Sequence, residues 1–255
     1  MDMRSGIIDV HVHLRGDGLP NKFWRAVDRY GVEKVMVSSL GRVWRYIPTV
    51  DEFREANADV ARLIKEQSDR VIGYVYVNPC YEEEALDEVK KGFQVYGCKG
   101  LKLWVSCICT DPRVEPLVEW VTENNGFILL HSWQKAKGNL PGESTPADVA
   151  TLAKRYPNTV FIMAHIGGDW ERGIKAVRNC PNVLIDTCGS ITSAGAIERA
   201  VKYLGVRRVV YGSDACGNDF GPNIGKIYGA CLPEEDERKI FKENIEEVLA
   251  GRWLK

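Results

Sequence analysis

Short runs of apolar residues recur along the chain, and longer stretches with helical spacing separate them. The runs are rich in valine, isoleucine and leucine and almost continuous in apolarity, which indicates parallel strands that are buried on both faces. They predict strands at residues 7–10, 34–38, 71–77, 100–105, 127–130, 160–164, 183–186 and 208–211.

The stretches between the runs predict amphipathic helices. These lie at residues 51–67, 81–96, 112–125, 144–156 and 191–205, and a final helix at 233–251 follows the last strand. Ser144, Thr145 and Pro146 supply a cap and a first-turn proline for one helix, and Gly126 and Gly205 end two others.

Strands that alternate with helices along the whole chain predict an α/β fold, a single (β/α)8 TIM barrel domain over residues 1–255. A doubly wound sheet usually has fewer strands and a glycine fingerprint after the first strand, where this chain has HVHLRGDG. The long connections, 39–50 and 215–233, follow the second and eighth strands and so lie at the C-terminal face, where barrel enzymes build their active sites.

The composition is ordinary for a soluble domain, with 255 residues, 45% hydrophobic and 27% charged residues and a net charge of −1. The chain has no basic block and no apolar run of about 20 residues, so we expect neither nucleic acid nor membrane as a partner. Its eight cysteines form no CxxC pair, and the N-terminus lacks the apolar stretch of a signal peptide. We therefore expect a cytoplasmic protein with a small-molecule substrate. Either a monomer or a homo-oligomer is compatible with the sequence.

All four histidines fall at the C-terminal ends of predicted strands. His11 and His13 end the first strand and point the same way, because side chains two residues apart share a face. His131 ends the fifth strand, His165 the sixth, and Asp214 follows the eighth. A single strand-end histidine is usually structural, but this set matches a Zn²⁺ site in which imidazoles and one carboxylate are ligands.

With these motifs the sequence resembles the amidohydrolase superfamily, and within it the amidohydrolase-2 branch of TIM-barrel metal-dependent hydrolases. The resemblance covers DVHVHL in the first strand, residues 77–104, His131, AHIGG, GSD and the closing KIFKENIEEVL. The chain departs from the branch in the loop after Asp214, which reads GSDACG where many relatives have GSDYP. It also lacks the flanking β-sandwich of many amidohydrolases, which is typical of the compact branch.

The resemblance implies that His11, His13, His131 and Asp214 bind metal. It implies that His165 either binds a second metal or polarises the substrate. Lys102 matches the position at which many relatives with two metals carry a carboxylated lysine that bridges them. The lysine must be carboxylated for that role, because a free ammonium is a poor ligand. The alternative is an unmodified lysine that binds an anionic substrate or forms a salt bridge.

The expected cofactor is Zn²⁺, as one or two divalent ions, with Mn, Fe or Co as alternatives. Such a metal makes hydroxide available at neutral pH, Asp214 would transfer the proton, and His165 would stabilise the oxyanion. This predicts hydrolysis of an amide, ester or lactone in a small and anionic substrate held by Arg15, Trp104 and Trp133. The alternatives are a non-oxidative decarboxylase or hydratase and, more remotely, a metal-binding protein without turnover.

Overall fold

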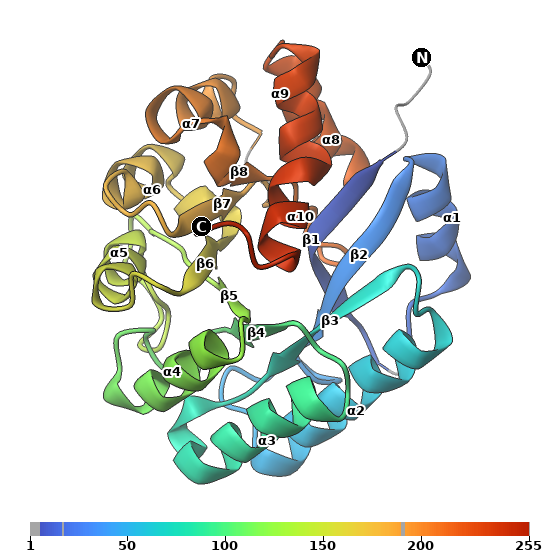
Figure 1. Cartoon of the computed structure of the whole chain (residues 1–255), viewed down its shortest axis with the longest axis vertical. Coiled ribbons are helices and arrows are strands. Elements are labelled where there is room, and N and C mark those ends of the chain that lie inside the picture. The colour runs from blue at the N-terminus through green and yellow to red at the C-terminus, as the bar shows by residue number, and fades with distance from the viewer. Residues whose placement is uncertain (1–5, 17, 190–191, 255) are drawn as a thin grey trace.

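A computed structural model of the chain describes residues 6–16, 18–189 and 192–254. Eight parallel strands neighbour one another in sequence order, with helices between them (Figure 1). The strands are β1 (Ile7–Leu14), β2 (Val32–Ser39), β3 (Val71–Tyr76), β4 (Gly100–Leu103), β5 (Phe127–Leu130), β6 (Val160–Met163), β7 (Val183–Asp186) and β8 (Val209–Val210). The predicted (β/α)8 barrel is confirmed.

The seam between the first and last strands is closed mainly by the residues that follow β8. The amide of Val10 donates to the Tyr211 carbonyl over 3.0 Å, and the amide of Asp214 donates to the His11 carbonyl over 2.8 Å. Val12 pairs in parallel with Ala215. Because of this seam, Asp214, which follows β8, lies directly beside the histidines of β1.

Helices connect the strands and surround them. They are α1 (Asn21–Arg29), α2 (Val50–Glu66), α3 (Glu82–Gln94), α4 (Glu115–Glu123), α5 (Pro146–Arg155), α6 (Trp170–Val177), α7 (Ala196–Leu204), α8 (Phe220–Gly229), α9 (Glu234–Arg238) and α10 (Asn244–Leu249). Thr145 caps α5 in a capping box with Asp148, and Gly205, with φ 84°, ends α7.

Three helices, α1, α6 and α8, lie outside the predicted helical ranges, and the final helix differs in form from its prediction. The predicted connection at 215–233 contains α8, which the pattern hid because Gly221, Pro222, Gly225 and Gly229 all weaken a helical signal. The predicted final helix is continuous from α9 to α10 but passes through a π-helical segment, Lys239–Glu243. The predicted helix at 191–205 appears as α7, and its first residue lies outside the described residues.

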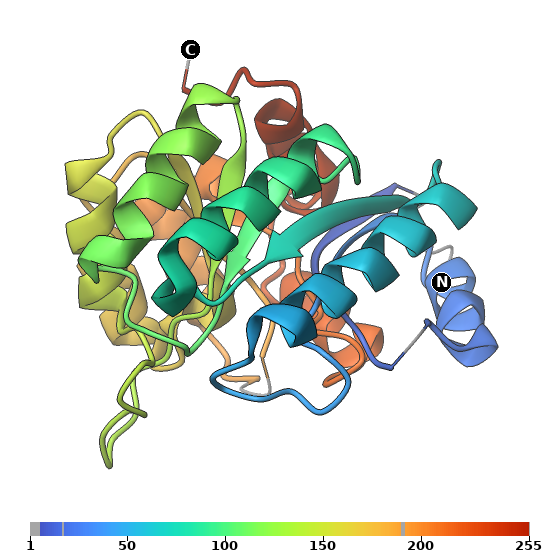
Figure 2. The same ribbon diagram turned by 90° about the horizontal axis from the view of Figure 1, so that it is seen from below.

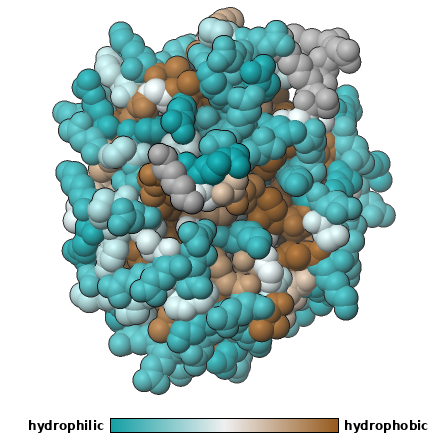
Figure 3. All heavy atoms as spheres, in the orientation of Figure 1, coloured by the Kyte–Doolittle hydropathy of each residue, from teal (hydrophilic) through white to brown (hydrophobic). Residues whose placement is uncertain are grey.

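The core has two layers. Side chains that point into the barrel form one cluster, to which α10 contributes Ile245 and Val248. A larger cluster fills the space between the strands and the surrounding helices. In the orientation of Figure 1, polar side chains cover most of the surface and apolar ones gather toward its centre (Figure 3).

The loops that follow β2 and β5 extend from the same side of the barrel (Figure 2). In a parallel barrel this is the face where the C-terminal ends of the strands meet. Among the described residues, no helix is both long enough and apolar enough to cross a membrane.

Candidate metal centre

β1 brings His11 and His13 together at the interior of the barrel mouth. The two Nε2 atoms are 3.0 Å apart, and both side chains are almost completely buried. β1 extends to Leu14, beyond the predicted end at residue 10, so both residues lie in the C-terminal half of the strand. Side chains two residues apart in a strand share a face, which accounts for their common direction, although the pairing of β1 with β2 shifts register between Asp9 and Val12.

Burial lowers the pKa of all four histidines, and nearby charged groups add to this for His11 and His13. The rings are therefore neutral at pH 7, and each keeps one nitrogen lone pair that can bind a metal.

Asp214 completes the first group of candidate ligands. Its Oδ1 atom lies 3.4 Å from Nε2 of His13 and 3.8 Å from Nε2 of His11. Asn218 donates to the other oxygen, Oδ2, over 2.8 Å, which leaves Oδ1 directed at the histidines. Asp214 has φ 60°, a conformation that non-glycine residues adopt rarely and often at functional sites. Burial raises the pKa of this carboxyl to about 6 although Lys102 opposes the shift.

Lys102, the third residue of β4, is 1% exposed. Its Nζ atom lies 3.0 Å from Nε2 of His11. Burial lowers the pKa of the ammonium to about 8, against the opposing effect of the Asp214 and Asp186 carboxylates. Lys102 thus lies beside the candidate ligands, and its role and its carboxylation stay predictions.

His131 and His165 form a second pair that adjoins the first. Nδ1 of His131 lies 3.3 Å from Nε2 of His165, and the ring of His165 lies 5.2 Å from that of His11 between centroids. His165 follows β6 in a turn where it has φ 62° and the next residue, Ile166, has φ 49°. The predicted ligands therefore gather as two groups, His11, His13 and Asp214 in one and His131 with His165 in the other.

The sequence-based prediction missed Glu143, which orients His131. Oε1 of Glu143 lies 3.1 Å from Nε2 of His131, and Oε2 accepts from Lys135 over 2.6 Å. Burial opposes ionisation of Glu143, but the hydrogen bonds from His131 and Lys135 outweigh it and lower the pKa to about 2. Glu143 sits in the β5–α5 loop, away from any strand end, so the strand pattern gave no signal for it.

The prediction also missed Asp186 and Cys188 at the end of β7. Oδ2 of Asp186 lies 2.7 Å from Nδ1 of His11, and Sγ of Cys188 lies 3.1 Å from Nδ1 of His165. Together the four residues are close enough to be a second group of possible ligands. Burial raises the pKa of the Cys188 thiol well above its usual range. Their place at the end of a predicted strand, like that of the histidines, was a signal that would have found them.

Two of the predicted substrate-binding residues lie near the centre, Trp133 in contact with His131 and Trp104 in contact with Trp44. The ring of Trp133 stacks on His131 with centroids 6.3 Å apart, whereas Trp104 reaches the centre only through Trp44. Trp44 lies 5.3 Å from the His13 ring, and the Arg15 guanidinium lies 4.8 Å from the Trp44 ring centre. Arg15 is exposed to solvent and contacts the site through Trp44.

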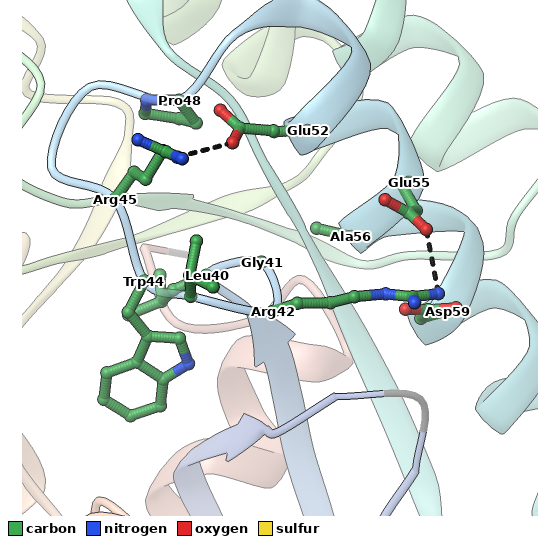
Figure 4. A pocket seen from close by; sticks show the side chains of 11 residues that line it. Leu40, Gly41, Arg42, Trp44, Arg45, Pro48, Glu52, Glu55, Ala56 and Asp59 are labelled. Atoms are coloured by element: carbon green, nitrogen blue, oxygen red, sulfur yellow. Dashed lines mark ion pairs between the residues drawn. The ribbon is translucent and has the colours of Figure 1, made fainter.

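The loop between β2 and α2 that carries Trp44 encloses a pocket on its other side (Figure 4). Arg42 pairs with Glu55 over 2.8 Å and Arg45 with Glu52 over 2.7 Å, which joins the loop to α2. Trp44 is among the residues that line this pocket (Figure 4). The residues that line this pocket include no histidine, whereas a second pocket is lined by Trp133, His165, Cys188 and Lys226 among others.

The donor set fits a divalent metal. Two neutral imidazole nitrogens and a carboxylate oxygen, from His11, His13 and Asp214, all lie within 4.8 Å of one another and are largely shielded from water. This combination of nitrogen and oxygen donors suits Zn²⁺, Mn²⁺ and similar ions.

A model of the family described as Amidohydrolase matches residues 8–250 of this chain. Among curated proteins, none matches the sequence. The sequence-based assignment to this family is confirmed.

Solved structures share the fold over almost their full length. 2,6-Dihydroxybenzoate decarboxylase from Rhizobium has a TM-score of 0.79 at 14% identity, with 97% of this chain and 99% of that chain covered. 5-Carboxyvanillate decarboxylase from Sphingomonas paucimobilis has 0.77 at 15%, with 97% and 99% covered. Dihydroxybenzoic acid decarboxylase from Polaromonas sp. JS666, with bound manganese and the inhibitor 2-nitroresorcinol, has 0.76 at 16%, with 97% of each chain covered. At such identities the likeness establishes the fold alone.

Proposed function

Because this chain belongs to the amidohydrolase family, we propose that it is a metal-dependent, non-oxidative decarboxylase of a small aromatic carboxylic acid. The observation that carries the proposal is the convergence of His11, His13 and Asp214 on one buried point beneath a rim of tryptophans. Similar proteins named as decarboxylases favour this reaction over the hydrolysis that the sequence suggested.

In this proposal His11, His13 and Asp214 hold one divalent metal. Mn²⁺ is favoured because a similar decarboxylase contains it, and Zn²⁺ is the alternative that the ligand set allows. When bound, the metal supplies positive charge that orients an anionic substrate and stabilises charge developing on its oxygens.

The surrounding residues bind and orient the substrate. A flat ring would pack against aromatic side chains, and two of them border the centre, Trp133 against His131 and Trp44 against His13. The buried ammonium of Lys102 is the cation nearest to the centre and would bind the substrate carboxylate. Arg15, on the outer side of Trp44, would attract the anion to the mouth.

The reaction exchanges a carboxylate for a proton. A proton is added to the ring carbon that bears the carboxylate, the bond to the carboxylate carbon breaks with its electron pair left on the ring, and CO₂ leaves. In this proposal the Asp214 carboxylate transfers the proton, and Asn218, which donates to Oδ2, orients it. His165, whose side chain lines the pocket beside Trp133, is the second candidate for proton transfer.

The proposal is tested by assaying the purified chain, after metal analysis and loading with Mn²⁺ or Zn²⁺, against hydroxylated benzoates and against esters, lactones and amides. We expect CO₂ release from aromatic carboxylates alone. Asp214→Asn should lower kcat by about 10²- to 10⁴-fold, because an amide cannot exchange the proton. Asp69→Asn is the matched control, since Asp69 is exposed in the turn before β3, at the other end of the barrel.

Other outcomes would contradict the proposal in distinct ways. Turnover of esters, lactones or amides without CO₂ release would establish the hydrolase. Normal CO₂ release by metal-loaded Asp214→Asn would show that another group transfers the proton. Tight metal binding without turnover of any compound would favour a metal-binding protein.

A further inference from the structure

Asp186, the last residue of β7, is fully buried, and each of its carboxylate oxygens contacts a different histidine of the centre. Oδ2 lies 2.7 Å from Nδ1 of His11. Oδ1 accepts the backbone N–H of His165 over 2.7 Å and that of Cys188 over 3.2 Å. Asp186 thus joins β7 to β1 and to the turn after β6.

We propose that Asp186 is a positioning residue that fixes His11 with its proton on Nδ1 and so directs the Nε2 lone pair to the metal. An ionised carboxylate can only accept hydrogen bonds, so Nδ1 of a neutral His11 must donate to it. The other ring nitrogen is then left without a proton. It faces His13 and Asp214, the two other candidate ligands.

Lys102 gives independent support for this tautomer. An ammonium has donors and no acceptor, so its contact of 3.0 Å with Nε2 of His11 requires a lone pair on that nitrogen. Partners on opposite edges of the ring, Asp186 and Lys102, therefore specify the same proton position.

The second oxygen of Asp186 acts on the backbone. His165 has φ 62° and ψ 23°, in the left-handed region, where a residue with a side chain needs support from its surroundings. The hydrogen bond from its N–H to Oδ1 supplies that support and keeps the His165 ring against Cys188 and His131. One buried carboxylate thus orients one histidine by its ring and another by its backbone.

A different interpretation is that Asp186, Cys188, His11 and His165 bind a metal themselves. The distance of 2.7 Å between Oδ2 of Asp186 and Nδ1 of His11 is that of a hydrogen bond to a charged acceptor. The hydrogen-bonded interpretation accounts for the contact directly.

Imidazole NMR of the whole chain, labelled with ¹⁵N-histidine, tests the proposal. Only four histidines contribute signals, and long-range ¹H–¹⁵N correlations distinguish a protonated ring nitrogen from an unprotonated one. We expect His11 to carry its proton on Nδ1, both in the metal-free chain and in the chain loaded with diamagnetic Zn²⁺. A proton on Nε2 in the metal-free chain, or an unprotonated Nδ1 in the Zn²⁺-loaded chain, would overturn the proposal.

Asp186→Asn tests the cause. If the amide oxygen keeps the His165 N–H, the amide NH₂ faces Nδ1 of His11 and donates to it, so the ring proton must move to Nε2. We expect this tautomer change, together with a loss of affinity for Zn²⁺ of about 10- to 100-fold, measured by competition with a chelating dye. Unchanged tautomer and affinity would overturn the proposal.

Two further variants separate Asp186 from its neighbours. Glu143→Gln makes the same carboxylate-to-amide change beside His131 and should alter the His131 signals while leaving the His11 tautomer unchanged. Cys188→Ala removes a thiol that lies 3.2 Å from Nδ1 of His11 and donates to Oδ1 of Asp186 over 2.9 Å. Because Oδ2 of Asp186 keeps its contact with His11, this variant should also leave that tautomer unchanged. If Cys188→Ala moves the proton, the thiol and not Asp186 controls it.

If Asp186→Asn does not fold, the wild-type measurement can still overturn the proposal. None of these measurements requires a substrate, so a negative result here is distinct from a failure of the proposed decarboxylase activity.

Discussion

Buried polar side chains at the barrel mouth must each find a partner, and these partners decide which atoms remain free for chemistry. Asp186 engages one nitrogen of His11, and Glu143 engages one nitrogen of His131. The opposite nitrogen of each ring, Nε2 in His11 and Nδ1 in His131, faces other groups of the centre. The two histidines therefore present different nitrogens, which the residue type alone does not reveal.

Lys102 is the residue whose chemical state most affects the centre. For the proposed centre with one metal, we expect an unmodified lysine that binds the substrate carboxylate. Lys102→Met, which fills the same buried space, should leave the metal content unchanged and raise KM for aromatic carboxylates about 10- to 100-fold, from the loss of a hydrogen bond to a charged group worth about 1.5–3 kcal/mol. Metal analysis and steady-state kinetics measure both effects.

Lys99→Met is the control, because Lys99 is exposed and precedes β4, at the opposite end of the strand. It should change neither quantity. A loss of about one metal equivalent per chain in Lys102→Met, together with a carboxyl group on Lys102 in the wild-type protein, would instead establish the bridged site with two metals.

At the scale of elements, the turn between β6 and α6 places His165, and it depends on a close approach of the following helix. A Cβ atom on Gly173, in α6, would lie 1.9 Å from the carbonyl oxygen of Ile166. Only glycine therefore lets α6 (Trp170–Val177) pack against the left-handed turn at His165 and Ile166.

Gly173→Ala should consequently displace this turn. We expect the free energy of unfolding to fall by about 1–3 kcal/mol, as for other overpacked sites, and the NMR signals of His165 to shift. Urea denaturation measures the first effect. Gly225→Ala is the control, since Gly225 lies within α8 with nothing within 4 Å of its Cβ position, and it should stabilise the chain by about 0.5–1 kcal/mol. Equal stability of the two variants would contradict the packing argument.

The elements also show what a sequence can predict. Continuous apolar runs specified all eight strands, since a buried parallel strand has the same signature wherever it occurs. Histidines at strand ends, such as His11 and His131, were found because their position in the barrel follows from the chain order. Glu143 and the tautomers were not found, because a loop residue meets His131 only through folding of the loop itself. α8 was missed because glycines masked its helical pattern.

For the whole molecule, the candidate ligands lie on both sides of the seam where the barrel closes. His11 and His13 are on β1, and Asp214 follows β8, which has only two residues. A metal bound by all three would therefore join the first and last strands of the barrel at a place where the strand ladder is short. Oδ1 of Asp9 adds to this seam lower in the barrel by accepting the N–H of Ser213 over 3.0 Å.

Removal of the metal should therefore lower the thermal stability of the whole chain. An ion present at 100 times its dissociation constant adds about 2.7 kcal/mol to the stability of the folded state. For a chain of this size that corresponds to a change in Tm of about 5–10 °C, which calorimetry with and without a chelator measures. Hydrogen exchange should at the same time quicken at the seam amides of His13 and Asp214. His13→Gln is the control. Because this variant lacks one of the three ligands, the addition of Mn²⁺ should raise its Tm only slightly. A wild-type Tm that does not depend on metal would contradict a metal at the seam.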